Sequence, residues 1–197
     1  KSKYWASAVQ SVQKAMEINE NDFECHRLFG EVNLSSNDFR AAEMHARKCY
    51  EMVPNDPRVL SIYGDVLVRV GSVDEGLEAL ERALELDPVA QGKNNSDSRT
   101  AAVLFGYFMA RDKNKCVEFI EKLQEVDTQS WLLTAKICSD EEVNYKTQKW
   151  FQDGLVKFVE IDWEKEVDRF HLNNAGAQEA LVEFAHSNFP ASPQISD

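Results

Sequence analysis

The chain has 197 residues, of which 43% are hydrophobic and 28% are charged, a composition that supports a sizeable folded core. Its formal net charge of −12 argues against binding to nucleic acids and to anionic membrane surfaces, because both require clusters of Lys and Arg. No apolar run approaches the roughly 18 residues that suggest a transmembrane helix. We therefore expect a soluble, cytoplasmic protein whose acidic surface is either simply solvated or complementary to a basic partner.

The first 22 residues predict one amphipathic helix, because apolar side chains recur there at helical spacing. This helix matches the second half of the repeating pattern that follows it. Residues 1–22 therefore predict the second helix of a truncated repeat, and we expect the chain to be a fragment of something longer.

Residues 23–88 contain two copies of one pattern, 23–56 and 57–88, which are offset by 34 residues. Each copy predicts two short amphipathic helices joined by a tight turn, with Pro54 or Pro88 after the second helix. A period of this length is typical of a helical repeat array. The corresponding residues are Phe29 and Tyr63, Gly30 and Gly64, Asn37 and Gly71, Ala42 and Gly76, Ala46 and Leu80, and Cys49 and Ala83.

Local signals predict how these helices begin, end and approach one another. The small residue Gly30 lets the antiparallel partner helix come close, and we expect Asp38 to cap that partner. In the second copy, Gly71 predicts a left-handed helix end. Ser72 and Glu75 have the spacing of a capping box.

The register breaks after the second copy. A third copy in phase would place its glycine at position 98, but the matching Gly106 lies eight residues later. The polar composition of residues 89–98 predicts an inserted loop, either a tolerated surface insertion or a contact loop at one rim. Residues 99–127 then predict a degenerate third copy, with Leu123 and Val126 still inside its second helix.

Residues 128–189 predict C-terminal helical hairpins that close the array, with helices at 129–139, 141–161, 163–172 and 178–189. We expect the large aromatic residues of this part to form its core, and the alternative is an exposed oligomer or ligand surface. The tail 190–197 is predicted to be flexible. The aromatic residues in question are Trp131, Trp150, Phe151, Phe158, Trp163 and Phe170.

Candidates for chemistry are few. His45 and Cys49 lie four residues apart, as a base and a nucleophile would, but Cys49 occupies a small-residue core position. The four cysteines form no C-x-x-C pair and fit buried, reduced thiols better than a disulfide framework. No phosphate-binding glycine motif or nucleophile elbow is present, and the histidines lack metal-ligand spacing. We expect no enzyme activity, no cofactor and no metal site.

The 34-residue pattern resembles the tetratricopeptide repeat (TPR) family. The resemblance covers residues 1–88 and extends more weakly over 99–127. His26 and Leu60 depart from it, because the family favours Trp there, and Asn33 and Leu67 stand where it favours Tyr. The residues that carry the resemblance are Phe29-Gly30, Tyr63-Gly64, Asn37, Gly71, Phe39, Val73, Ala42, Gly76, Ala46, Leu80, Cys49, Ala83, Pro54 and Pro88.

This resemblance implies an all-α fold, a right-handed superhelical solenoid of antiparallel helix pairs with a degenerate C-terminal cap. It also implies a non-catalytic scaffold that binds a protein, a peptide or a partner helix in a concave groove lined by the first helix of each pair. The alternative is that the same side chains form solvated faces supported by i,i+4 ion pairs. The groove candidates are Glu24, Arg27, Glu31, Leu34, Arg58, Ser61, Ile62, Asp65 and Arg69.

The charges on the predicted first helix of the first copy argue against one use of TPR arrays. Arrays that bind the C-terminal carboxylate of chaperones use a Lys and an Asn four residues apart, and Arg27 and Glu31 hold these positions here. Because Glu31 would repel a peptide carboxylate, we expect no carboxylate clamp.

A weaker resemblance links the chain to the C-terminal TPR arrays of bacterial nucleotide-cyclase-type regulators. It implies an alternative function, a regulatory or oligomerising segment of a larger signalling enzyme, and a homo-oligomer stays open. The segments that carry it are Ala41–Glu43, Asn55–Leu60, Gly71–Glu78, Leu104–Ala110 and Ala177–Ala185.

Overall fold

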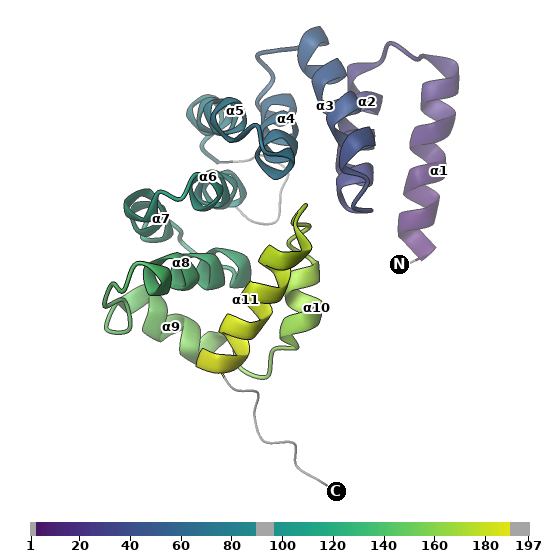
Figure 1. Cartoon of the computed structure of the whole chain (residues 1–197). Coiled ribbons are helices and arrows are strands. Elements are labelled where there is room, and N and C mark those ends of the chain that lie inside the picture. Colours follow the sequence, from purple (N-terminus) through teal and green to yellow (C-terminus); the bar gives the residue numbers. More distant parts are fainter. Residues whose placement is uncertain (1–2, 90–96, 190–197) are drawn as a thin grey trace, which may run out of the picture. The chain divides into compact units, whose positions relative to one another are not determined.

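The computed structural model describes residues 3–89 and 97–189, and this part of the chain is all-α (Figure 1). Eleven helices lie within these residues, and they pack mainly in sequential antiparallel fashion. In the same residues no helix is both long and apolar enough to cross a membrane. The predicted tail at 190–197 and most of the predicted loop at 89–98 lie outside the described residues. The chain divides into a first unit, Lys1–Pro88, and a second unit, Val89–Asp197.

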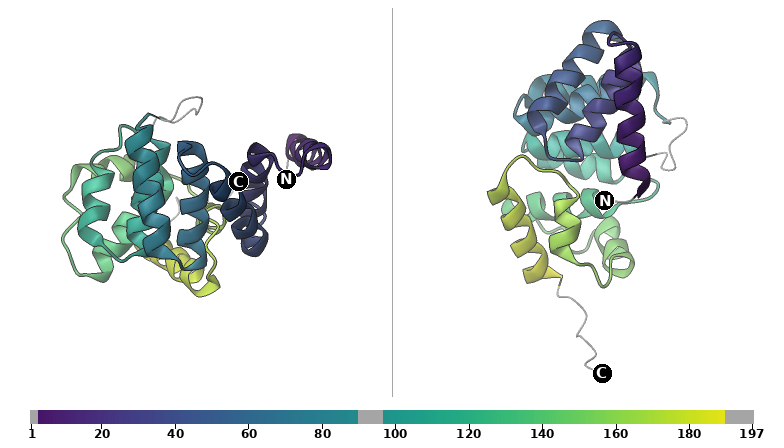
Figure 2. Two further views of the ribbon diagram at one scale, coloured as in Figure 1. Left: turned by 90° about the horizontal axis from the view of Figure 1, so that it is seen from above. Right: turned by 90° about the vertical axis from the view of Figure 1, so that its right-hand side faces the viewer.

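The first unit consists of five helices that follow one another along the chain (Figures 1 and 2): α1 (Lys3–Ile18), α2 (Phe23–Leu34), α3 (Phe39–Met52), α4 (Pro57–Val70) and α5 (Val73–Leu86). Each helix packs against the next, and α2 also contacts α4. The starts of α2 and α4 lie 34 residues apart, as do the starts of α3 and α5. The predicted tight turn lies between Leu34, where α2 ends, and Phe39, where α3 begins directly after Asp38.

Glycines allow close approach between helices of the first unit. A Cβ atom added to Gly64 would lie 2.5 Å from the backbone oxygen of Gly76 on α5. At Gly30 the approach is looser, because an added Cβ would lie 3.9 Å from the backbone oxygen of Ala42 and 3.1 Å from the side chain of Ile62. Close approach of the antiparallel partner helix through a glycine is therefore found at Gly64. Gly30, where it was predicted, lies closest to Ile62 of the next pair instead.

The helix ends follow two of the three predicted signals. The Asp38 side chain accepts a hydrogen bond from the Ala41 backbone N–H at 3.1 Å, and Gly71 ends α4 with a left-handed φ of 98°. The predicted capping box at Ser72 and Glu75 is wrong, since the Ser72 side chain makes no capping hydrogen bond. The Glu75 carboxylate instead accepts a hydrogen bond from the Tyr63 hydroxyl. A tertiary partner has therefore replaced the local one.

The second unit contains six helices: α6 (Ser98–Met109), α7 (Lys113–Ile120), α8 (Thr128–Asp140), α9 (Lys149–Lys157), α10 (Trp163–Asp168) and α11 (Ala175–Asn188). Helix α8 is its centre, because it contacts α6, α7, α9 and α11. Helix α10 packs on α11.

Three predicted helices of the second unit are shorter than expected. The single helix predicted at 141–161 is confined to α9, because Glu142 and Glu160 have left-handed φ angles of 55° and 57° that a continuous helix excludes. Helix α10 ends at Asp168, three residues before His171, whose φ is 50°. Helix α7 ends at Ile120, so Leu123 and Val126 lie beyond it.

The aromatic residues of the second unit form its core, which confirms the prediction for all of them except Phe158, which is half-buried. Trp131 on α8 is the central member, with 0% of its surface exposed. Its Nε1–H donates to the backbone oxygen of Phe151 at 3.2 Å, and its ring lies 4.5 Å from that of Phe189 and 6.4 Å from that of Trp163, centroid to centroid. Offset and tilted aromatic contacts of this kind add stability beyond that of buried area alone.

Candidate functional site

The predicted groove residues of α2 and α4 form a connected network of ion pairs. Arg58 Nη1 lies 2.8 Å from Glu24 Oε1, a contact between the same position of the two helix pairs, 34 residues apart. Arg27 bridges Glu24 at 2.8 Å and Glu31 at 2.6 Å, and Arg58 also pairs with Asp56 at 2.7 Å. Residues from two helices are thereby joined into one charged face.

The electrostatics of this face favour the charged forms of Arg27 and Asp56. Burial of the Arg27 guanidinium opposes its charge, but the hydrogen bond and the charge of Glu24, together with the charge of Glu31, raise its pKa overall. The hydrogen bonds that Arg58 donates lower the pKa of the Asp56 carboxyl. Arg27 and Arg58 differ in access, since their side chains are 14% and 48% exposed. Arg58 is therefore the more accessible of the two cations.

Two predicted groove residues do not line this surface. Leu34 and Ile62 are only 7% and 6% exposed, and both belong to the hydrophobic core of the first unit. Ile62 faces Gly30 of the neighbouring helix, so the missing Cβ of that glycine makes the space for it. These two residues stabilise the fold and do not contact a partner directly.

The remaining predicted residues are half-buried on α4. Ser61 Oγ donates to the backbone oxygen of Pro57 at 2.8 Å, and Arg69 pairs with Asp65 at 2.9 Å. The predicted i,i+4 pairs are thus both present, here and between Arg27 and Glu31. They are compatible with a binding face as well as with a solvated one.

The pair His45 and Cys49 is not arranged as a base and a nucleophile. Cys49 is fully buried, its thiol donates to the backbone oxygen of Ala46 at 3.1 Å, and burial raises its pKa to about 11. His45 instead contacts His26, with 2.9 Å between the two Nδ1 atoms. A protonated, enclosed thiol is a poor nucleophile.

A second polar cluster in the first unit was not predicted. Arg47 on α3 donates to the Tyr63 hydroxyl at 3.2 Å and to Glu75 at 3.3 Å, and it also pairs with Glu43 at 2.9 Å. Tyr50 stacks on Tyr63 with 4.1 Å between ring centroids. Apart from the local pair of Arg47 with Glu43, these contacts join α3, α4 and α5. No local sequence pattern signals the hydrogen bonds of Arg47 and Tyr63 between helices, because their partners are 12 to 28 residues apart.

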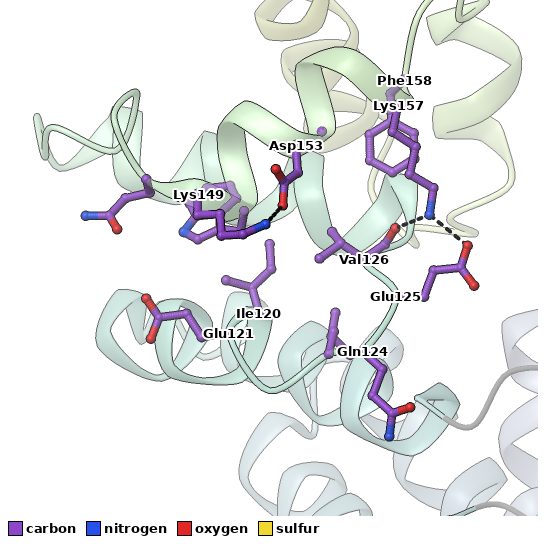
Figure 3. Close-up of a pocket in the computed structure, with 13 residues that line it drawn as sticks. Ile120, Glu121, Gln124, Glu125, Val126, Lys149, Asp153, Lys157 and Phe158 are labelled. Carbon is purple, nitrogen blue, oxygen red and sulfur yellow. Dashed lines mark hydrogen bonds and ion pairs between the residues drawn. The ribbon is translucent and has the colours of Figure 1, made fainter.

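A cavity of about 530 Å³ lies in the second unit, between α9 and the segment that follows α7 (Figure 3). Ile120, Val126 and Phe158 give it an apolar lining, and charged pairs stand at its rim. Lys157 Nζ lies 2.9 Å from Glu125, and Lys149 pairs with Asp153. Its volume is in the range of small-ligand sites. Sequence patterns could not locate it, because five of its 13 lining residues come from the irregular segment after α7.

In the described parts of the chain, no group of three or more His, Cys, Asp or Glu side chains is placed to hold a metal ion. Comparison with models of known protein families gives no match, and a search of curated protein sequences gives none either.

Proposed function

We propose that this chain is a TPR-like helical-repeat scaffold that binds a protein segment, a peptide or a helix, along the face of α2 and α4. The proposed architecture is a right-handed solenoid of helix pairs, with the last helices of the second unit as a degenerate cap. The observation that carries the proposal is the contact between Glu24 and Arg58 at the same position of two helix pairs offset by 34 residues. Equivalent positions of stacked repeats become neighbours in this way.

Packing supports the same proposal. Gly30 and Gly64 occupy equivalent positions. Gly64 faces α5, the second helix of its own pair, at short range, and Gly30 makes room for Ile62 of the next pair. Helix α3 carries three small residues that are fully buried, Ala42, Ala46 and Cys49. A 34-residue repeat requires two helices that pack closely on each other through small residues. Each pair must also bury its other side against the next pair.

The charges suggest how a partner would bind. Arg58 is nearly half exposed and shares its guanidinium between Glu24 and Asp56, so an acidic or carbonyl-rich segment can take over one of these contacts. Glu31 at the far end of the same network disfavours a free carboxylate there. We therefore propose an internal segment of a partner protein as the ligand and no carboxylate clamp.

Charge reversal tests this proposal. Peptides are selected on the full chain from a random display library, and the affinity of the best one is then measured by calorimetry. We expect Arg58→Glu to weaken binding at least about tenfold, because it removes the exposed cation and adds repulsion. The matched control is Arg82→Glu on α5, where Arg82 is exposed and bonds Asn55 at 2.7 Å. Equal affinity of the two variants, or the enrichment of no peptide, would contradict the proposal.

A second candidate function, an oligomerising segment, is favoured by exposed apolar side chains at the end of α9. Val156 and Val159 are 80% and 59% exposed, beside the cavity lined by Phe158. Exposed apolar clusters of this kind mark association surfaces.

Light scattering separates the two candidates. If the segment oligomerises, the mass should rise with concentration in the wild type and stay monomeric in Val156→Lys. The control Ile18→Lys changes an exposed residue of α1 and should leave the mass unchanged. A wild type that is monomeric at high concentration removes this candidate.

A further inference from the structure

Two histidines connect three segments of the first unit. The Nδ1 atoms of His26 on α2 and His45 on α3 are 2.9 Å apart. His26 Nε2 lies 3.0 Å from the backbone oxygen of Glu20, in the turn between α1 and α2. The His45 ring also stacks on Phe29, with 5.0 Å between centroids. Since His26 is only 9% exposed, most of this contact is shielded from water.

The neighbours of the two rings determine their tautomers. A carbonyl oxygen only accepts hydrogen bonds, so His26 Nε2 must carry the proton that points to Glu20. A neutral imidazole has one N–H, so His26 Nδ1 is an acceptor and His45 Nδ1–H is the donor to it. The lone pair of His45 is then on Nε2. The result is a directed chain of hydrogen bonds from His45 through His26 to Glu20.

We propose that this chain is a proton-sensitive clasp that opens when both imidazoles are protonated. A first proton can bind His45 Nε2 and leave the clasp closed. A second proton must bind His26 Nδ1, the acceptor of the contact, and two N–H groups with two positive charges then face each other. Opening separates His26, and with it the α1–α2 turn, from α3.

Protons can reach the two histidines through the cavity that both of them line. Both histidines line a cavity of about 720 Å³, to which the turn contributes Glu20 and α3 contributes Arg47, Lys48 and Glu51. Among the described residues, α1 lines it with Met16 and α2 with His26. In the described part of the chain neither imidazole forms an ion pair with a carboxylate. Glu20, Lys48 and Glu51 share the cavity with them, and Arg47 pairs with Glu43 and Glu75.

The sign of the pH dependence follows from burial. Burial of His45, and then the charge of His26, lower the pKa of His45 below that of an unfolded histidine, about 6.5. Its contribution to stability is therefore fully present above about pH 6.5 and is lost as the pH falls through the folded pKa.

Nitrogen NMR of the imidazoles tests the clasp directly. At about pH 8 we expect His26 as the Nε2–H tautomer and His45 as the less common Nδ1–H tautomer, with the Nδ1 proton shared with His26. Towards about pH 5 both rings should become imidazolium, and the amides of the α1–α2 turn should exchange faster relative to those of α5. Two Nε2–H tautomers at high pH would overturn the proposal.

Variants provide the second test. The melting temperature of the wild type should fall by about 3 °C or more between about pH 7.5 and pH 5. The melting temperature of His45→Gln should fall less over the same pH range, because the Gln amide can donate a hydrogen bond to His26 without titrating. The control His186→Gln should lose as much as the wild type, since His186 lies in the second unit, 2.9 Å from Glu164. An equal fall in melting temperature for His45→Gln and the wild type would refute the clasp. If His45→Gln does not fold, the imidazole tautomers of the wild type decide the question.

Discussion

Gly64→Ala is expected to lower the free energy of unfolding by about 3 kcal/mol or more, the upper range for overpacking a dense interior. The added Cβ would lie 2.5 Å from the backbone oxygen of Gly76 and 2.7 Å from Leu80 Cγ. A backbone oxygen inside a helix cannot rotate away, so α4 and α5 must separate. Urea unfolding followed by circular dichroism measures the change.

The matched control is Gly30→Ala, at the equivalent position of the preceding pair. Its nearest contact is a side-chain atom, Ile62 Cγ1 at 3.1 Å, which can shift by a few tenths of an ångström. The higher helix propensity of Ala offsets part of this cost, and we expect a change within about 1 kcal/mol. A similar loss in both variants would show that the two helix pairs are packed equally closely, contrary to the structure.

Gly154→Ala is expected to have an effect at least as large, again about 3 kcal/mol or more, on the second unit. Its Cβ would lie 2.0 Å from Trp131 Nε1. The Trp131 ring cannot move aside, because it is fully buried, bonded to the Phe151 backbone and packed on Trp163 and Phe189. The destabilisation should appear as a lower urea midpoint when unfolding is followed by tryptophan fluorescence.

Gly176→Ala controls for the chemistry of the substitution. Gly176 lies in the first turn of α11, and an added Cβ would approach nothing closer than the Asn174 side-chain oxygen at 3.4 Å. We expect a change between zero and a gain of about 0.5 kcal/mol, as a helical Ala replaces Gly. A tolerated Gly154→Ala would mean that α9 does not press against Trp131.

Local patterns predicted the first unit well for a physical reason. Helix periodicity, the Asp38 cap and the left-handed Gly71 act over a few residues, so they can be read from neighbouring positions.

Reasoning from local patterns failed at Glu75, where a hydrogen bond from Tyr63 replaced the local cap. It also failed in the predicted helix 141–161, where only backbone angles at Glu142 and Glu160 revealed the ends of α9.

The candidate site was predictable only in part. Register placed Glu24 and Arg58 on equivalent positions, and the structure brings them to 2.8 Å. Register also placed Ile62 on that surface, whereas it is buried against Gly30, because helical spacing identifies the side of a helix but not how closely the next helix covers it.

Taken by itself, the sequence determined the all-α character, the two helix pairs 34 residues apart and the glycines between them, since these depend on periodicity and on residue size. Only the tertiary structure decided which groove residues are accessible, and that His26 meets His45 across 19 residues. Contacts between side chains from different helices depend on how the helices are placed in space, and no spacing along the chain encodes that placement.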